Sequence, residues 1–117
     1  MSRRNTTLHY LKYWQRQLNL QDWNLQIEFV KFKRKDNFNQ SGDIDVNLKT
    51  KQAVVKITHE TTGKDKAIIL HELLHLKLWE YDHFCELHLK PEFKDKYFEL
   101  LEKVIANLTE FFLMRDN

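Results

Sequence analysis

One apolar segment, residues 67–79, constrains the fold more than any other part of this 117-residue chain. Its sequence, AIILHELLHLKLW, puts apolar side chains on nearly every face of a helix, and such a helix is buried in a globular protein. Two histidines and a glutamate interrupt the run, and buried polar side chains need partners. His71 and His75 stand one helical turn apart on the same side, with Glu72 beside them. Both imidazoles can therefore bind one metal ion, and the H-E-x-x-H pattern indicates zinc.

Two histidines do not complete such a site, so a third ligand must come from another part of the chain. Catalytic zinc sites commonly use three protein ligands and keep a fourth position for water. The segment that follows the helix offers six candidates, which are His83, His88, Glu92, Glu99, Glu102 and Glu110.

The helical periodicity of the C-terminal segment ranks the carboxylates. Its apolar face is formed by Phe98, Leu101, Val104, Ile105, Leu108, Phe111 and Phe112. When the first of these is set at 0°, Glu99 lies at about 100° and Glu110 at about 120°, where both face water. Glu102 falls at about 40°, at the margin of the apolar face, where it can lie against a partner helix. We therefore predict Glu102 as the third ligand, with Glu99, His83 and His88 as the alternatives.

The remaining pattern predicts an α+β domain. Thr6 or Thr7 is placed to cap a first amphipathic helix. Alternating apolar residues predict strands at residues 23–33, 43–48 and 53–58, and the last two are close enough to form a hairpin. Together these strands predict a small, mostly antiparallel sheet.

Two long helices are expected after the sheet. Thr62 or Asp65 can cap the central helix, which is predicted to run to about Trp79. The final helix is predicted to begin near Pro91 and to continue to Met114.

Composition and charge limit the class of protein. A hydrophobic content of 42% with only two glycines and one proline predicts a single compact domain over residues 1–117. The net charge of +2 gives no strong field for nucleic acid or membranes, so we expect neither as a partner. The basic residues 31–35, with Phe32 among them, are the feature on which a nucleic-acid-associated protein remains an alternative.

The cysteine count and the N-terminus predict where the protein is found. Cys85 is the only cysteine, which excludes an intramolecular disulfide. The N-terminus lacks an apolar signal core, and no apolar run is long enough to span a bilayer. We expect a cytoplasmic protein and a monomer.

The motif H-E-L-L-H, followed by a glutamate on a later helix, resembles the gluzincin branch of the zincin metallopeptidases. The short chain resembles the minigluzincins, which are compact single-domain members of that branch. The resemblance covers about residues 18–108, including Trp23 at the start of the first strand, the strand at residues 54–57 and the helical residues 101–108. It implies a zincin-like fold, with an N-terminal helix, a sheet, an active-site helix and a C-terminal helix that carries the glutamate.

The sequence differs in two places from the motifs of other zincin branches, and these differences limit which branch it resembles. Leu78 and Tyr81 stand where the metzincin extension has glycine and histidine, which argues against that branch. Ala106, four residues after Glu102, replaces the acidic residue that larger gluzincins have at this position.

The resemblance implies a zinc-dependent endopeptidase that acts on a peptide or protein substrate. In this function His71, His75 and Glu102 bind zinc, and Glu72 is the general base. The strand before the central helix would bind an extended peptide by backbone pairing. The group that stabilises the developing oxyanion would be one of Tyr81, His83 and His88.

The rival hypothesis is a zinc-stabilised binding module that is inactive or latent. A domain of this size has little second subdomain with which to enclose a cleft. Residues 113–117 are long enough to reach back into the cleft, which would produce a latent enzyme.

Overall fold

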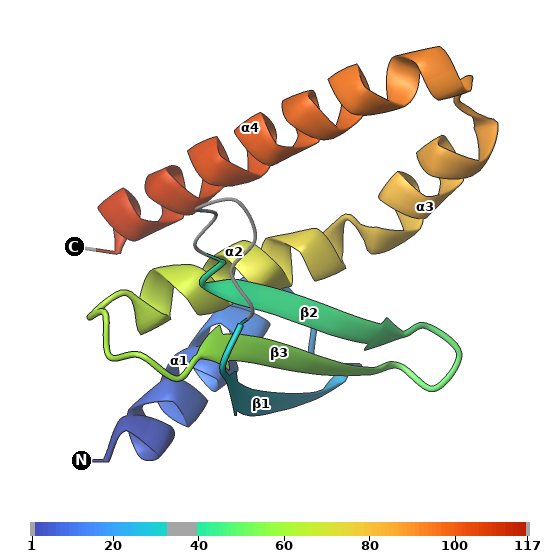
Figure 1. The fold of residues 1–117 in the computed structure, drawn as a ribbon. Coiled ribbons are helices and arrows are strands. Elements are labelled where there is room, and N and C mark those ends of the chain that lie inside the picture. The colour runs from blue at the N-terminus through green and yellow to red at the C-terminus, as the bar shows by residue number, and fades with distance from the viewer. Residues whose placement is uncertain (1, 33–39, 117) are drawn as a thin grey trace.

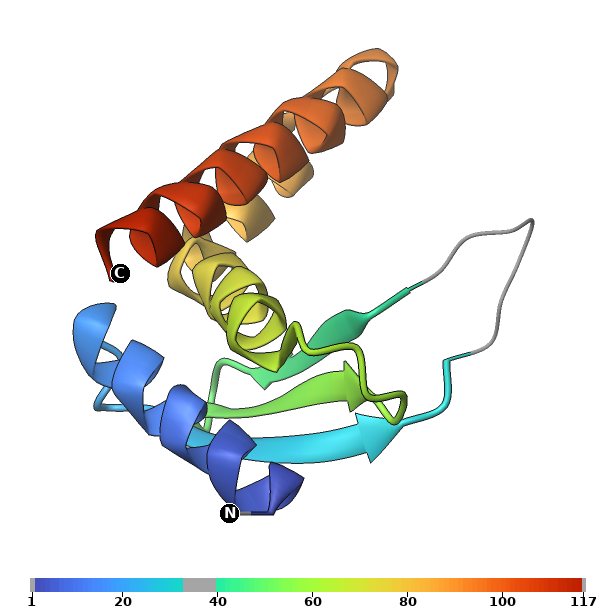
Figure 2. The same cartoon turned by 90° about the vertical axis from the view of Figure 1, so that its left-hand side faces the viewer.

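The computed structural model describes residues 2–32 and 40–116. Its elements follow the chain in the order α1 (Arg3–Gln17), β1 (Asn24–Val30), β2 (Gly42–Asn47), β3 (Gln52–Thr58), α2 (Asp65–Lys77), α3 (Trp79–His88) and α4 (Pro91–Arg115). Helices α1 and α2 lie on one face of the sheet, and α4 packs on the outer side of α2 (Figure 1, Figure 2). The predicted α+β class is confirmed.

The sheet is mixed, with β3 as its central strand in the order β1-β3-β2. β3 pairs in parallel with β1, where Ile27 lies opposite Val55, and antiparallel with β2, where Ile44 lies opposite the same residue. The predicted hairpin of β2 and β3 is confirmed, but the expectation of a mostly antiparallel sheet is wrong. β3 takes the central place because its inward side chains Ala53, Val55 and Ile57 are all buried, as a strand paired on both edges requires.

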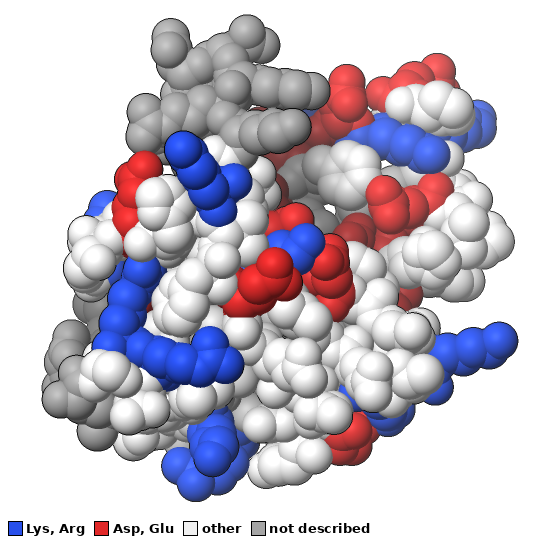
Figure 3. Space-filling view, turned by 60° about the horizontal axis from the view of Figure 1, so that its bottom comes forward, with Lys and Arg blue, Asp and Glu red and all other residues white. Residues whose placement is uncertain are grey.

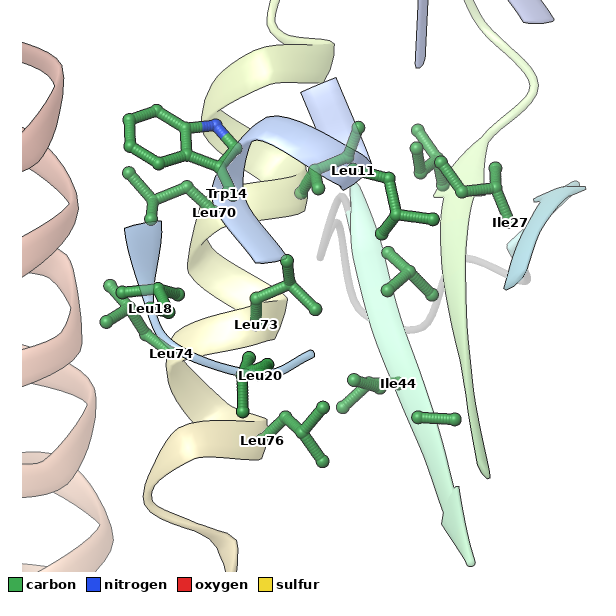
Figure 4. Close-up of a cluster of buried hydrophobic side chains, with 14 of the residues drawn as sticks. Leu11, Trp14, Leu18, Leu20, Ile27, Ile44, Leu70, Leu73, Leu74 and Leu76 are labelled. Atoms are coloured by element: carbon green, nitrogen blue, oxygen red, sulfur yellow. The ribbon is translucent and has the colours of Figure 1, made fainter. Parts of the chain in front are cut away.

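The hydrophobic core fills the space between α1, α2 and the inner face of the sheet (Figure 4). Leu11 and Trp14 enter it from α1, and Ile27 and Ile44 enter it from the two outer strands. The largest share comes from α2, whose buried apolar residues are Ile69, Leu70, Leu73, Leu74 and Leu76. The expectation that this apolar helix is buried is therefore confirmed, because α4 covers the side that the sheet and α1 leave open.

The first helix begins earlier than its sequence predicts. Ser2 is the N-cap, and its Oγ accepts a hydrogen bond of 3.2 Å from the backbone N–H of Asn5. Thr6 and Thr7 lie inside α1, and Thr7 is buried. The predicted caps were wrong because a serine one turn upstream satisfies the free N–H groups of the first turn.

Neither of the predicted caps of α2 closes the helix with its side chain. Lys64 occupies the N-cap position without a side-chain hydrogen bond, and Thr62 lies outside the helix. The Asp65 carboxylate instead accepts hydrogen bonds from Arg3, at 2.9 Å from Nε and 3.0 Å from Nη2. Asp65 therefore links the start of α2 to α1. It was predicted to cap the helix, but its carboxylate forms a tertiary ion pair with Arg3 instead.

The central helix ends at Lys77, close to its predicted end near Trp79, and residues 79–88 form an additional helix, α3, that the sequence did not predict. Leu78 joins the two, with φ −97° and ψ 7°. α4 matches its predicted bounds closely, from Pro91 to Arg115. Among the described helices, none is long and apolar enough to cross a membrane.

Candidate metal centre

The two histidines of the motif project from α2 toward α4. Their ring centroids are 5.1 Å apart at an interplanar angle of 61°, as expected for residues one turn apart. Both side chains are partly exposed, with relative exposures of 28% for His71 and 19% for His75. They therefore stand at the boundary between the core and a cavity, where an ion could reach them.

Glu102 of α4 completes the group. Its Oε1 lies 2.8 Å from Nε2 of His75, and its Oε2 lies 3.5 Å from Nε2 of His71. One ligand atom from each of the three residues lies within 4.8 Å of the other two, a spacing that one metal ion can bridge. The helix-face argument therefore selected the glutamate that the fold brings to the histidines.

The environment of His71 favours its neutral form. Burial is the largest effect and lowers the pKa of His71, and repulsion from His75 lowers it further. Glu102 acts in the opposite direction, because its negative charge favours a protonated imidazole. A neutral imidazole is the form that binds a metal ion.

Glu72 lies behind the histidines and is buried, with 8% of its surface exposed. Burial raises the pKa of its carboxyl group to about 8, and the nearby charges of Asp43 and Glu102 add to this effect. Without a bound cation this carboxyl group holds its proton at neutral pH. A cation at the adjacent histidines would favour the carboxylate, since an opposite charge nearby lowers the pKa of an acid.

The edge strand β2 borders the site at close range. A Cβ atom on Gly42 would lie 2.7 Å from Cγ2 of Ile68 and 3.1 Å from Oε2 of Glu72. A glycine here lets the backbone of β2 approach α2 closely. The resulting cavity of about 590 Å³ lies between this strand, α2 and α4, and His71, Glu72, His75 and Glu102 all line it.

The other candidate ligands lie away from this group. His83 and His88 are exposed on α3, and the ring of His88 lies 4.4 Å from that of Phe84. Glu99 is exposed and pairs with Lys96 at 3.4 Å. Glu92 and Glu110 are exposed elsewhere on α4 and are not members of the group.

The residues suggested for oxyanion stabilisation do not line the cavity in the part of the chain that the structure describes. Tyr81 is 64% exposed on α3, beyond the end of α2, and His83 and His88 are exposed on the same helix. The structure thus supports none of these three residues in that role. Trp79, at the start of α3, lines the cavity instead.

The C-terminal segment does not enter the cavity as far as the structure describes it. Asp116 pairs with Lys66 of α2 and accepts a hydrogen bond from the hydroxyl group of Tyr13 of α1. Residues 113–116 are absent from the cavity lining, and Asn117 lies outside the described residues. This position does not support a latent form in which residues 113–116 block the site.

The basic residues 31–35 can be followed only in part, because residues 33–35 lie outside the described residues. On the face shown in Figure 3, acidic and basic side chains are interspersed. On β3, Lys56 pairs with Asp45 at 2.7 Å and has Glu28 and Asp43 nearby. Among its described residues, this face therefore offers no continuous basic surface of the kind that binds phosphate backbones.

Sequence reasoning missed the contribution of β2 to the site. Asp43 and Gly42 approach Glu72 only because β2 is the strand next to α2, which follows from the strand order. The local signal available was Gly42 at the start of an alternating segment, since glycine at such a position often marks a close backbone approach.

Comparison with models of known protein families, with curated proteins and with solved structures finds no match. The resemblance to zincins therefore depends on the residues of this sequence alone.

Proposed function

We propose that the protein is a zinc-dependent endopeptidase of the gluzincin type, in a small minigluzincin-like form with a zincin-like fold. The observation that carries the proposal is the convergence of His71, His75 and Glu102 beside the buried Glu72. These four residues come from two helices that are far apart in the sequence, and they meet at one cavity.

The donor set fits zinc. Two imidazole nitrogens and one carboxylate oxygen form a common catalytic zinc environment, in which a further position remains for water. The buried Glu72 and its two acidic neighbours, Asp43 and Glu102, supply negative charge that a divalent cation would balance. Zinc bound here would lower the pKa of a water molecule and polarise the carbonyl group of a peptide.

The residues of the chain would then carry the proton transfers. Glu72 would accept a proton from the attacking water and return it to the leaving amine. His71, His75 and Glu102 would hold the ion, and the burial of His71 keeps its imidazole neutral for that purpose. A substrate peptide would lie in the cavity between β2 and α4.

The strand that binds the substrate is β2 in this proposal. The sequence placed that role on β3, but β3 is hydrogen-bonded on both edges and cannot accept another strand. β2 has one edge outside the sheet, and its residues Gly42, Asp43 and Ile44 line the cavity. An extended peptide could pair with that edge.

Metal analysis and peptide cleavage together test the function. We expect one zinc per chain in the purified protein, and loss of zinc when His75 or Glu102 is replaced by alanine. Glu72→Gln should keep the zinc and lose peptide cleavage, since only the proton carrier is changed. A protein without stoichiometric zinc, or a Glu72→Gln variant with unchanged cleavage, would refute the proposal.

A second candidate function is a zinc-stabilised binding module, and the packing of α4 favours it. Only Ile105 and Thr109 are buried on this 25-residue helix, so an ion shared by α2 and Glu102 would fasten α4 to the domain. In that case removal of zinc should lower the melting temperature strongly, while no peptide in a broad library is cleaved. Cleavage that depends on Glu72 would exclude this module.

A further inference from the structure

A second apolar surface runs along α4, on the side that faces away from the core. Successive members follow at alternating spacings of four and three residues, and they are Phe93, Tyr97, Leu100, Val104, Asn107, Phe111 and Met114. We call this set the α4 stripe. Such alternation is the heptad pattern of a coiled coil, and it extends over three heptads.

The α4 stripe is exposed in the single chain. Phe93, Leu100, Val104 and Phe111 are 47–53% exposed, and Met114 is 75% exposed. Helical geometry places the stripe roughly 130° around α4 from the buried Ile105. The two views of the ribbon show α4 as an outer layer of the molecule (Figure 1, Figure 2). At Tyr97, which is partly buried, the stripe contacts α3, because the Tyr97 hydroxyl group donates a hydrogen bond of 2.8 Å to Asp82.

The amount of exposed surface is enough for an interface. A large side chain that is about half exposed leaves on the order of 100 Å² open to water. The five exposed apolar members of the stripe therefore offer on the order of 500 Å² per chain. Two such surfaces together reach the approximately 1,000 Å² that a specific interface needs.

The polar members of the surface select a second copy of the same chain in parallel orientation. In a parallel, in-register pair every stripe residue meets its own counterpart, so Asn107 meets Asn107 of the second copy. The two amides can then hydrogen-bond to each other. An antiparallel pair instead sets Asn107 against Val104 or Tyr97 and leaves the amide without a matching partner.

The charges beside the stripe agree with the same arrangement. Tyr97, Val104 and Phe111 are the a positions of this heptad pattern. In a parallel coiled coil, the residue just before each a position faces the residue five positions later in the other helix. Glu110 then faces Arg115 of the second copy, which gives two opposite-charge pairs. The two lysines at the equivalent flanking positions, Lys96 and Lys103, face Leu101 and Leu108, so no like charges are brought together.

We propose that the protein forms a parallel homodimer through the α4 stripe. The heptad spacing of exposed apolar residues on α4 is the observation that carries this inference, and it replaces the expectation of a monomer. The inference does not depend on zinc or on peptidase activity. Because the stripe faces away from α2, the sheets and metal centres of the two copies lie on the outside of the pair.

Sedimentation velocity tests the dimer. The wild-type chain should sediment at twice its mass of 14.3 kDa, whereas Leu100→Glu and Val104→Glu should weaken association at least a hundredfold. Both residues are about half exposed, so the variants should keep the far-ultraviolet circular dichroism of the wild type. Leu87→Glu on α3 is the matched control, since Leu87 is 68% exposed but lies outside the stripe, and its mass should stay doubled.

Two sedimentation results would overturn the dimer. One is a wild-type monomer at about 0.1 mM, a concentration a hundred times a micromolar Kd. The other is a doubled mass that both stripe variants retain.

Cross-linking tests the orientation. In a Cys85→Ser background, Met114→Cys should form a disulfide-linked dimer on mild oxidation, because a parallel pair brings residue 114 of both copies together. Glu99→Cys is the control on the same helix, since Glu99 is exposed away from the stripe and should not cross-link. A dimer in which the Met114→Cys variant fails to cross-link would refute the parallel arrangement.

Discussion

Replacing Glu72 with glutamine should stabilise the metal-free protein at alkaline pH. Burial raises the pKa of Glu72 from 4.5 to about 8 in the folded protein, with further contributions from Asp43 and Glu102. Between these two values the folded state keeps a proton that the unfolded chain has released. The free energy of unfolding of the wild type must therefore fall as the pH rises from about 4.5 to about 8, and it levels off above that range.

The magnitude follows from the size of the shift. One pKa unit corresponds to about 1.4 kcal/mol, so the full shift sets a ceiling of about 5 kcal/mol on the loss. Glutamine has the same shape and carries no charge, so it removes this loss. We expect the variant to gain about 2 to 5 kcal/mol over the wild type at alkaline pH and little at acidic pH.

Urea unfolding followed by tryptophan fluorescence measures the effect. The protein should be treated with a chelator, and wild type and variant compared at about pH 5 and about pH 9. All other titrating groups affect both proteins equally, so the difference between their free energies of unfolding reports on residue 72 alone. Glu99→Gln is the control, because Glu99 is an exposed carboxylate on α4. If wild type and Glu72→Gln lose the same stability between the two pH values, the argument from burial is wrong.

Three further substitutions test how the domain holds the site. Ile105→Ala should lower the free energy of unfolding by about 2 to 4 kcal/mol in urea titrations, since Ile105 is fully buried where α4 meets the core. Gly42→Ala should cost about 1 to 3 kcal/mol in the same assay, because the added Cβ would lie 2.7 Å from Cγ2 of Ile68. Asp116→Asn should lower the melting temperature at neutral pH. Its pairing with Lys66 lowers the pKa of Asp116, so this loss should disappear as the pH falls below about 4.

The sequence predicted those parts of the site that depend on a single helix. The spacing of His71 and His75 requires only that residues 65–77 be helical, and the placement of Glu102 at the margin of the apolar face requires only its angle on α4. Both conditions are local, so a periodic pattern reveals them. The prediction of Glu102 as a ligand also required that α4 pack against α2. The apolar face of α4 favours that packing, because it must be buried against another element.

The parts that the sequence could not supply depend on the order of elements in space. The short turn between β2 and β3 shows that they are neighbours, but no local signal tells whether β1 joins β3 or β2. β1 joins β3, and this choice turns β2 into the edge strand beside the site. The approach of Asp43 to Glu72 follows from that choice, so it was not visible beforehand.

The exact end of the central helix, and the helix α3 that follows it, were not visible for a different reason. Residues 67–79 contain no glycine or proline, and their apolar pattern continues through the junction of α2 and α3. The chain turns there because the backbone of one residue departs from helical geometry, with ψ at 7°. Helix propensity does not locate such a turn to the residue, since Leu78 itself favours a helix.

The two faces of α4 would allow one helix to serve both the proposed metal centre and the proposed interface. Toward the core, Ile105 and Thr109 are buried, and Asp116 pairs with Lys66 near the end of the helix. The partly buried α4 residues that pack against the core are Leu101, Leu108, Phe112 and Leu113. Glu102, at 57% exposure, stands beside this packed face. A partner helix on the α4 stripe would oppose bending of α4 away from α2, because it restrains the same helix from the opposite side. Pairing through the stripe and an ion between α2 and α4 would thus act on the same helix, from its two sides.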